Sequence, residues 1–315
     1  MRLVFMGTPQ FAVPSLRILL ESSHEVVGVV TQPDRPKGRG QVVMPPPVKE
    51  LALLNDVPVV QPEKMKALEF LECLEAWNPD VIVVTAFGRI LPKAILDVPR
   101  QGCVNVHGSL LPAYRGAAPI QWAIINGETQ TGITTMFMDE GMDTGDILLQ
   151  EQVDIHVDET AGELAIRLAE VGGRLLVPTL EKLEAGSLTR IPQDDAQASL
   201  APILTKSEGC IDWTLSARQI VDRVRGLSPW PGTFGSLEGQ RMTIWQAHEM
   251  VSSPEEQKSQ PGTITAVGKK EVVVSAGQGS VGITEWQPAN KKRMTVEQFL
   301  SGNGLSPGMM FQTPS

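Results

Sequence analysis

Leu3-Val4-Phe5-Met6-Gly7-Thr8-Pro9 is the stretch that decides the fold of the first part of the chain. Its four apolar residues end at a glycine turn. Thr8 and Pro9 are residue types that open a helix, as the N-cap and the first helical residue. We therefore predict a buried strand over Leu3–Met6 and a helix over Pro9–Leu20.

The same alternation of strand and helix continues to about residue 190. Further strands are predicted at Glu25–Val30, Val57–Val60, Asp80–Val84, Cys103–Val106 and Ile133–Met138. Further helices are predicted at Pro47–Asn55, Ala67–Trp77, Ala118–Asn126 and Ala161–Leu183. Runs this apolar suit a parallel sheet buried on both faces, so we expect an α/β domain with its ligands at the carboxyl ends of the strands.

A polar stretch, Arg190–Ser199, interrupts this pattern. Beyond it come one amphipathic segment at Ser216–Gly226 and then short β-like runs separated by turns that contain glycine. These runs are Met242–Ala247, Gly262–Val267, Glu271–Ser275 and Val281–Trp286. The pattern predicts a small β-rich domain, a sandwich or a barrel. We therefore expect domains at residues 1–189 and 207–315, joined by a linker at 190–206.

Composition excludes several classes of protein. The chain has 315 residues, of which 42% are hydrophobic and 20% charged, as in an ordinary globular protein. Apolar runs such as Val81–Val84 are far shorter than the roughly 20 residues that span a bilayer, and we expect no membrane segment. Three scattered cysteines (Cys73, Cys103 and Cys210) argue against a disulfide framework or a zinc cluster and suit the cytoplasm.

The net charge of −9 at first disfavours a nucleic-acid partner. The charge is unevenly distributed, however. From Lys206 to the end the chain carries 11 basic and 10 acidic residues, so the acidic excess lies in the part before it. A nearly neutral C-terminal third can still present a basic face.

His107 is the histidine with the strongest catalytic signal. It directly follows a predicted strand, whereas His24, His156 and His248 have no polar constellation around them. Asn105 stands two residues earlier and points to the same side of that strand. An amide donor and a titratable imidazole at one point suit a site that polarises a carbonyl and moves a proton. The simpler alternative is that both side chains only bond to neighbouring loops.

Four carboxylates follow another predicted strand, in Asp139-Glu140-Gly141-Met142-Asp143-Thr144-Gly145-Asp146. The spacing does not match an EF-hand calcium loop. Gly141 and Gly145 instead allow a sharp turn that brings one carboxylate to a neighbouring strand end, where it would orient a histidine. Spacing alone does not say which aspartate does this.

A basic segment lies between residues 31 and 41. It carries Arg35, Lys37 and Arg39 among glycines and prolines, which is typical of a long functional loop with phosphate contacts. An ordinary solvated loop is an equal alternative on composition. A second basic cluster, Lys291-Lys292-Arg293, lies in the predicted C-terminal domain, where a solvated surface is the first expectation.

Several of these motifs together resemble the formyl-tetrahydrofolate-dependent transformylases. The central match is Asn105-Val106-His107-Gly108-Ser109-Leu110-Leu111-Pro112, followed by Asp143-Thr144-Gly145. Further matching pieces are Gly7-Thr8-Pro9, Thr31-Gln32-Pro33-Asp34-Arg35, Tyr114–Gln121, Ile211-Asp212-Trp213, Pro229-Trp230-Pro231 and Gln287-Pro288-Ala289. Each piece is weak alone, but the ordered set covers essentially the whole chain.

The resemblance implies a Rossmann-like parallel-sheet catalytic domain and a small OB-like β-barrel. It implies transfer of a formyl group from 10-formyltetrahydrofolate to the amino group of methionine on initiator tRNA, without a metal. Motif positions make Asn105, His107 and Asp143 the catalytic trio. They assign folate binding to Phe87, Gly88, Ile90, Ser109, Leu110, Leu111 and Pro112. They assign tRNA binding to Arg35, Lys37, Arg39, Lys291 and Lys292.

Other functions fit parts of the sequence. The nearest is a transformylase that acts on a small amine, or a formyl-folate hydrolase, although neither needs a cationic loop at Arg35–Gly40. A non-catalytic RNA-binding protein would not need Asn105, His107 and Asp143. A nicotinamide-dependent oxidoreductase is disfavoured because Gly7-Thr8-Pro9 is not a GxGxxG fingerprint. We expect a monomer.

Overall fold

The predicted first strand, β1 (Arg2–Gly7), lies inside a seven-stranded sheet in a computed structural model that describes residues 1–37, 42–251 and 259–312. The strand order is β10-β9-β7-β6-β1-β2-β5. The remaining bounds are Glu25–Val30 (β2), Val59–Val60 (β5), Val81–Thr85 (β6), Cys103–His107 (β7), Gln130–Phe137 (β9) and Ile147–Asp154 (β10). The predicted strands are therefore present, and β10 is an addition.

One edge of this sheet is antiparallel rather than parallel. Strands β7, β6, β1, β2 and β5 pair in parallel, whereas β9 runs antiparallel to β7 and β10 antiparallel to β9. The connection between β9 and β10, residues 138–146, is too short for the crossover that parallel neighbours need. The five parallel strands confirm the predicted Rossmann-like class.

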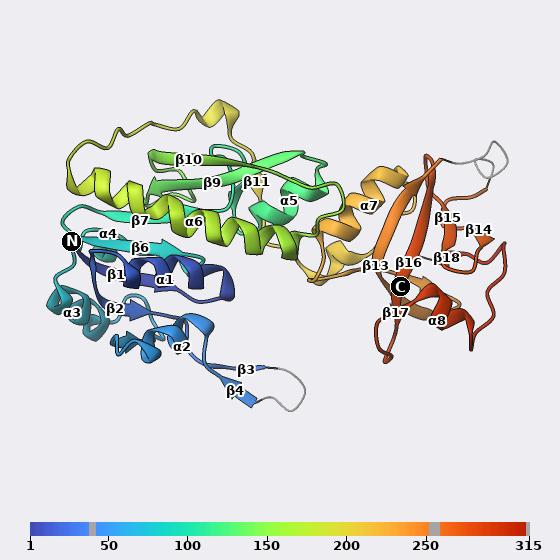
Figure 1. Ribbon diagram of the computed structural model, residues 1–315, viewed down its shortest axis with the longest axis horizontal. Helices are drawn as coiled ribbons and strands as arrows, with labels where there is room; N and C mark the ends of the chain where they lie inside the picture. Colours follow the sequence, from blue (N-terminus) through green and yellow to red (C-terminus); the bar gives the residue numbers. More distant parts are fainter. Residues whose placement is uncertain (38–41, 252–258, 313–315) are drawn as a thin grey trace. The chain divides into compact units, whose positions relative to one another are not determined.

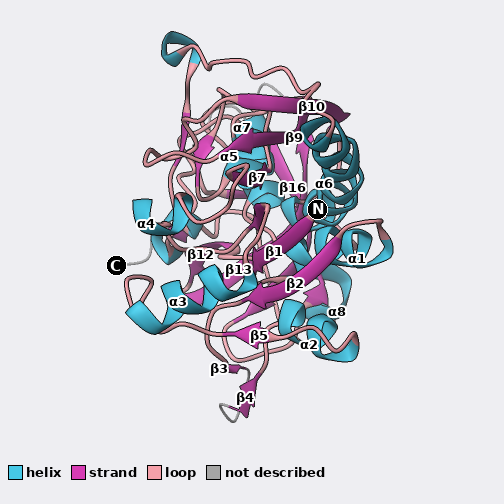
Figure 2. Cartoon of the chain, turned by 90° about the vertical axis from the view of Figure 1, so that its left-hand side faces the viewer, coloured by secondary structure: helices cyan, strands magenta, loops and turns pink. Residues whose placement is uncertain are grey.

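Helices cover both faces of the sheet (Figure 2). On one face lie α1 (Val13–Glu21) and α6 (Ala161–Glu184), whose Gly172 sits against Val106 and Ile133. On the other lie α3 (Leu68–Trp77) and α4 (Lys93–Leu96). Phe70 and Leu74 of α3 share a buried core with strand residues Val4, Ile82 and Val84. Helix α2 spans Pro47–Leu54.

The start of the first helix differs from the prediction. A 3₁₀ turn, Gln10–Ala12, precedes α1, and Thr8 does not cap it. The Thr8 hydroxyl instead donates to the carbonyl of Phe87 at 3.3 Å and accepts from the amide of Gln32 at 3.3 Å. It thereby joins the segments that follow β1, β2 and β6, so tertiary bonds replace the local cap.

The chain divides into two units. Unit 1 comprises Met1–Pro119, Gln130–Asp154 and Ala165–Pro202, and unit 2 comprises Ile120–Thr129, Ile155–Leu164 and Ile203–Ser315. Unit 2 thus includes two short stretches from the first 189 residues, and most of helix α5 (Pro119–Ile125) is in one of them. The domain boundaries given above stay predictions.

Unit 2 is built on a curled antiparallel sheet of order β14-β15-β16-β13-β12-β18 (Figure 1). Its strands are Thr233–Leu237 (β12), Gln240–Met250 (β13), Ile264–Val267 (β14), Val272–Ser275 (β15), Ser280–Pro288 (β16), Met294–Thr295 (β17, paired with β16) and Phe311–Gln312 (β18). A bridge between Thr263 and Met310 connects its two ends. Helices α7 (Ala217–Gly226) and α8 (Val296–Leu300) bury apolar residues against it around Trp213 and Trp286. The predicted barrel-like β domain is confirmed.

Part of the segment predicted as a long basic loop is a hairpin, β3 (Arg35–Lys37) with β4 (Val42–Met44). Asp34 lies at its base. Lys49 donates to both Asp34 oxygens at 3.0 and 2.7 Å, and Gln61 donates to Oδ1 at 2.8 Å. The hydrogen bonds from Lys49 and then Gln61 hold the pKa of Asp34 below its usual range.

We predict that Gly7→Ala destabilises unit 1. A Cβ at Gly7 would lie 2.7 Å from the Phe5 ring, 2.8 Å from the Ala12 Cβ and 3.0 Å from the Thr85 carbonyl, all tightly packed groups. Overpacking of this kind costs about 1–3 kcal/mol, read as a lower urea midpoint for unit 1. Gly302→Ala, where a Cβ would meet nothing within 4 Å, is the control and should be neutral. Equal midpoints for the two variants would contradict the prediction.

We also predict that acid removes the stability that Asp34 contributes at the base of the hairpin. Because the folded pKa of Asp34 is lowered, its charged form adds stability above the unfolded pKa, and this is lost as pH falls through the folded value. Asp34→Asn should therefore lower the urea midpoint at pH 7 and make little difference once the pH is well below about 4. A pH-independent gap between wild type and variant would argue against this role.

Candidate active site

The candidate site begins where β7 ends, at His107. Strand β7 lies between β6 and β9, with Asn105 paired to Val84 and Met136, and His107 paired to Thr134. Asn105 and His107 are two residues apart in one strand, so their side chains leave the same face of the sheet. The His107 side chain is 6% exposed and is therefore almost entirely buried.

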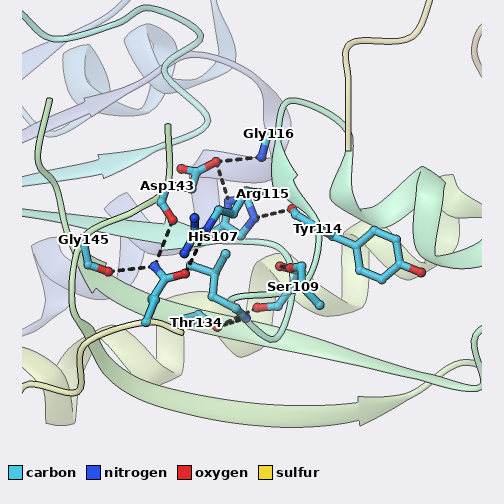
Figure 3. A network of polar contacts seen from close by, with 11 residues as sticks. His107, Ser109, Tyr114, Arg115, Gly116, Thr134, Asp143 and Gly145 are labelled. Atoms are coloured by element: carbon cyan, nitrogen blue, oxygen red, sulfur yellow. Dashed lines mark hydrogen bonds and ion pairs between the residues drawn. The ribbon is translucent and has the colours of Figure 1, made fainter. Parts of the chain in front are cut away.

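Two contacts hold the His107 ring (Figure 3). Its Nε2 lies 3.0 Å from the carbonyl oxygen of Tyr114, and its Nδ1 lies 3.6 Å from Oδ2 of Asp143. A carbonyl oxygen can only accept a hydrogen bond, so Nε2 carries a proton and donates it. Nδ1 is therefore the nitrogen that can gain or lose a proton, and it faces a carboxylate.

The Tyr114 carbonyl is aimed by an unusual backbone. Tyr114 has φ +62°, in the left-handed region, and its amide donates to the Ser199 hydroxyl at 2.9 Å. The preceding turn is fastened by Ser109, whose hydroxyl donates to the Ala113 carbonyl at 2.6 Å. Thr134 of β9 donates to the Ser109 carbonyl at 2.7 Å. The loop after β7 is thus held by hydrogen bonds with Thr134 of β9 and with Ser199.

Asp143 is the aspartate that reaches His107 from the acidic loop. Its φ is +54°, and its Oδ2 accepts from the Gly116 amide at 2.9 Å. Asp139 instead accepts from Gly141 and Thr144 within the loop. Gly145 is required by close packing, because a Cβ there would lie 1.9 Å from the Phe137 carbonyl.

Residues 190–201, the return segment, lie against these loops within unit 1. The Gln193 amide group donates to the carbonyls of Asp143 at 2.9 Å and Gly145 at 2.7 Å, while its oxygen accepts from Arg115 Nε at 3.0 Å. Strand β11 (Leu200–Ala201) pairs with β8 (Arg115–Gly116). Sequence reasoning missed Gln193 because the segment has the composition of a linker, and no motif marks this glutamine.

The residues assigned to folate binding have different environments. Ile90 is 80% exposed and lines a pocket of about 380 Å³ with Leu91, Pro92, Met65, Lys66, Lys93 and Glu140. Gly88 is exposed and Leu110 and Pro112 are half-buried, whereas the Phe87, Ser109 and Leu111 side chains are buried. The pocket beside Ile90 is partly apolar, and a pocket of about 380 Å³ suits a ligand with aromatic rings.

The Asn105 carboxamide has no hydrogen-bond partner within residues 1–37, 42–251 and 259–312.

The residues assigned to tRNA binding divide between the two units. Arg35 is exposed on β3 and donates to Gln32, and Lys37 ends the same strand. Arg39 lies outside the described residues. Lys291 and Lys292 are exposed in the turn between β16 and β17 of unit 2.

Neither a metal centre nor a membrane helix is found in the described part of the chain. No group of three or more His, Cys, Asp or Glu side chains is placed there to hold a metal ion. None of the helices described is long and apolar enough to cross a bilayer.

Comparisons with known proteins agree with this geometry. A family model described as "Formyl transferase" matches residues 1–180, and one described as "Formyl transferase, C-terminal domain" matches residues 203–304. Methionyl-tRNA formyltransferase of Acetivibrio thermocellus is 52% identical over 308 residues, covering 98% of each chain. The same enzyme of Desulfotalea psychrophila is 50% identical, covering 99% of this chain and 96% of the relative.

Solved structures share the fold at lower identity. An N-formyltransferase from Helicobacter canadensis, in complex with folinic acid and dTDP-3-aminofucose, superposes with a TM-score of 0.67 at 18% identity, covering 90% of this chain and 99% of the other. With two family models over most of its length and relatives at about half identity from end to end, the chain belongs to the formyl transferase family, among the methionyl-tRNA formyltransferases.

Proposed function

We propose that the protein transfers the formyl group of 10-formyltetrahydrofolate to the amino group of methionine on initiator methionyl-tRNA. The observation that carries the proposal is the His107 ring, held between the Tyr114 carbonyl and the Asp143 carboxylate at the carboxyl end of β7. The substrate comes from the names of relatives that share half of the sequence over its whole length.

The reaction needs a hydrogen-bond donor and a proton acceptor. Formyl-folate supplies an electrophilic formyl carbon bonded to nitrogen, and the amine of methionine adds to that carbon before the carbon–nitrogen bond to folate breaks. We assign Asn105 as the donor to the formyl oxygen, which gains negative charge as the amine adds. Its carboxamide is free of partners in the described residues, so it can make this bond without breaking another.

We assign His107 as the group that moves the proton. Nδ1 takes the proton that the amine loses and returns it to the departing folate nitrogen, while Nε2 keeps its bond to Tyr114. Asp143, at 3.6 Å from Nδ1, stabilises the charged ring between the two steps. The Gly116 amide holds the carboxylate in place at 2.9 Å.

Folate binding is assigned to the loops around Asn105, His107 and Asp143. We propose that the segments containing Phe87, Gly88 and Ile90 and those containing Ser109, Leu110, Leu111 and Pro112 line its site. The pocket of about 380 Å³ beside Ile90 supports this, since most of its lining is apolar. Its charged lining residues are Lys66, Lys93 and Glu140, so cations exceed carboxylates by one.

We predict that His107→Ala and Asn105→Ala both reduce formyl transfer to charged initiator tRNA. The expected losses in kcat are about 10²–10⁴-fold for the proton-transfer group and about 10²–10³-fold for the donor. His248→Ala is the matched control, because His248 pairs with Glu271 in unit 2 and is exposed. Near-normal turnover of Asn105→Ala with intact folate binding would refute the donor role.

The same assay separates the proposal from its nearest alternative. Release of tetrahydrofolate with a small amine or with water, but no transfer to tRNA, would assign the chain to the small-amine transformylases or hydrolases. The cationic residues at Arg35, Lys37 and Arg39 favour tRNA, because a small amine needs no such charges.

We propose that five cationic residues contact tRNA phosphates: Arg35, Lys37, Arg39, Lys291 and Lys292. Each phosphate contact contributes about 0.7–0.9 to the slope of log affinity against log salt. We therefore predict that Lys292→Ala lowers this slope by nearly one, while Lys182→Ala, an exposed lysine on α6, leaves it unchanged. Binding of tRNA that does not depend on salt would contradict the assignment.

A further inference from the structure

The return segment, residues 190–201, makes contacts that a passive linker would not make. Arg190 lies over the Phe137 ring at 4.0 Å from its centroid, and Ile191 forms a bridge with Ile147. Further along, the Ser199 hydroxyl accepts from the Tyr114 amide at 2.9 Å. Its first end is therefore fastened to strands β9 and β10 of the sheet and its other end to the loop after β7, and Gln193 lies between them.

Gln193 contacts the backbone that carries the Asp143 carboxylate. Asp143 has φ +54°, in the left-handed region that is unfavourable for an L-residue. The carbonyls of Asp143 and Gly145 both accept from the Gln193 amide nitrogen, at 2.9 and 2.7 Å. Two donated bonds across three residues oppose relaxation of this turn.

The orientation of the Gln193 side chain is fixed by its third partner. Arg115 Nε can only donate, so the glutamine atom 3.0 Å from it is the oxygen. Arg115 is 7% exposed, and the residue after it, Gly116, donates to the Asp143 carboxylate. Gln193, Arg115, Gly116 and Asp143 therefore close a ring of contacts, in which Gln193 holds the backbone of Asp143 and Gly116 holds its carboxylate. Figure 3 shows the bond from Gly116 to Asp143.

We propose that Gln193 is a positioning residue, which acts on formyl transfer through Asp143 by holding its turn so that the carboxylate faces Nδ1 of His107. The proposal rests on the formyl-transfer function given above. Gln193 touches neither His107 nor the reacting atoms, so its effect depends entirely on Asp143.

Gln193→Glu and Gln193→Ala test the donated bonds. Glutamate keeps the size of the side chain and the acceptor for Arg115 but has no donor for the two carbonyls. Both variants should lose about 10- to 100-fold in kcat with unchanged KM for both substrates, the range expected when a reacting group is displaced by about 1 Å. Gln197→Ala is the control, since its bond is to Asp194 within the return segment. A role in packing or in anchoring Arg115 predicts instead that Gln193→Glu keeps full activity, and that result would overturn the proposal.

A double-mutant cycle separates positioning from general structural support. In an Asp143→Asn background, Gln193→Ala should reduce kcat by less than about 3-fold, because the carboxylate that it positions is already gone. The same loss in both backgrounds would overturn the proposal.

A measurement that does not depend on enzyme activity separates failure of this proposal from failure of the proposed function. With four histidines in the chain, ¹³C-labelled histidine rings can be assigned by His107→Gln. The His107 signals of Gln193→Glu should move toward those of Asp143→Asn, whereas those of Gln197→Ala should stay at the wild-type position. Unmoved signals in Gln193→Glu would refute the positioning role, whether or not the wild type transfers formyl groups to tRNA.

Discussion

The hydrogen bond from His107 Nε2 to the Tyr114 carbonyl, 3.0 Å long, is the interaction on which the arrangement of the site depends. It commits Nε2 to the backbone and leaves Nδ1 facing the Asp143 carboxylate. The Asp143 carboxylate lies 3.6 Å from Nδ1.

The backbone that builds this arrangement is locally unfavourable. Both Tyr114 and Asp143 have positive φ, at a cost of about 1–2 kcal/mol each. Each is held by bonds from residues distant in the sequence, Tyr114 by Ser199 and Asp143 by Gly116 and Gln193. These two backbone conformations are therefore stable only in the folded unit. The two loops adopt the site geometry because tertiary contacts outweigh the local conformational preference.

The sequence predicts those features that depend on local pattern. Apolar runs locate the strands, and alternation along β7 places Asn105 and His107 on one face at a carboxyl strand end. It does not predict that Thr8 bonds to Phe87 and Gln32 instead of capping a helix, since that choice depends on which strands lie side by side. The antiparallel pairing of β9 with β7 likewise depends on which strands are neighbours. Strand β10, whose short connection to β9 requires an antiparallel pair, is not among the predicted strands.

Gln193 shows why composition alone cannot tell a linker from a site-forming segment. Polar and charged residue types suit a linker, because a linker runs over the surface, where water satisfies its polar groups. The same residue types also serve where a loop is held by its carbonyls, because side-chain donors can bond carbonyls that no strand or helix pairs. The return segment meets the second need: the carbonyls of Asp143 and Gly145 accept from Gln193. A polar stretch that follows a candidate catalytic loop is therefore a candidate source of positioning residues as well as a candidate domain boundary.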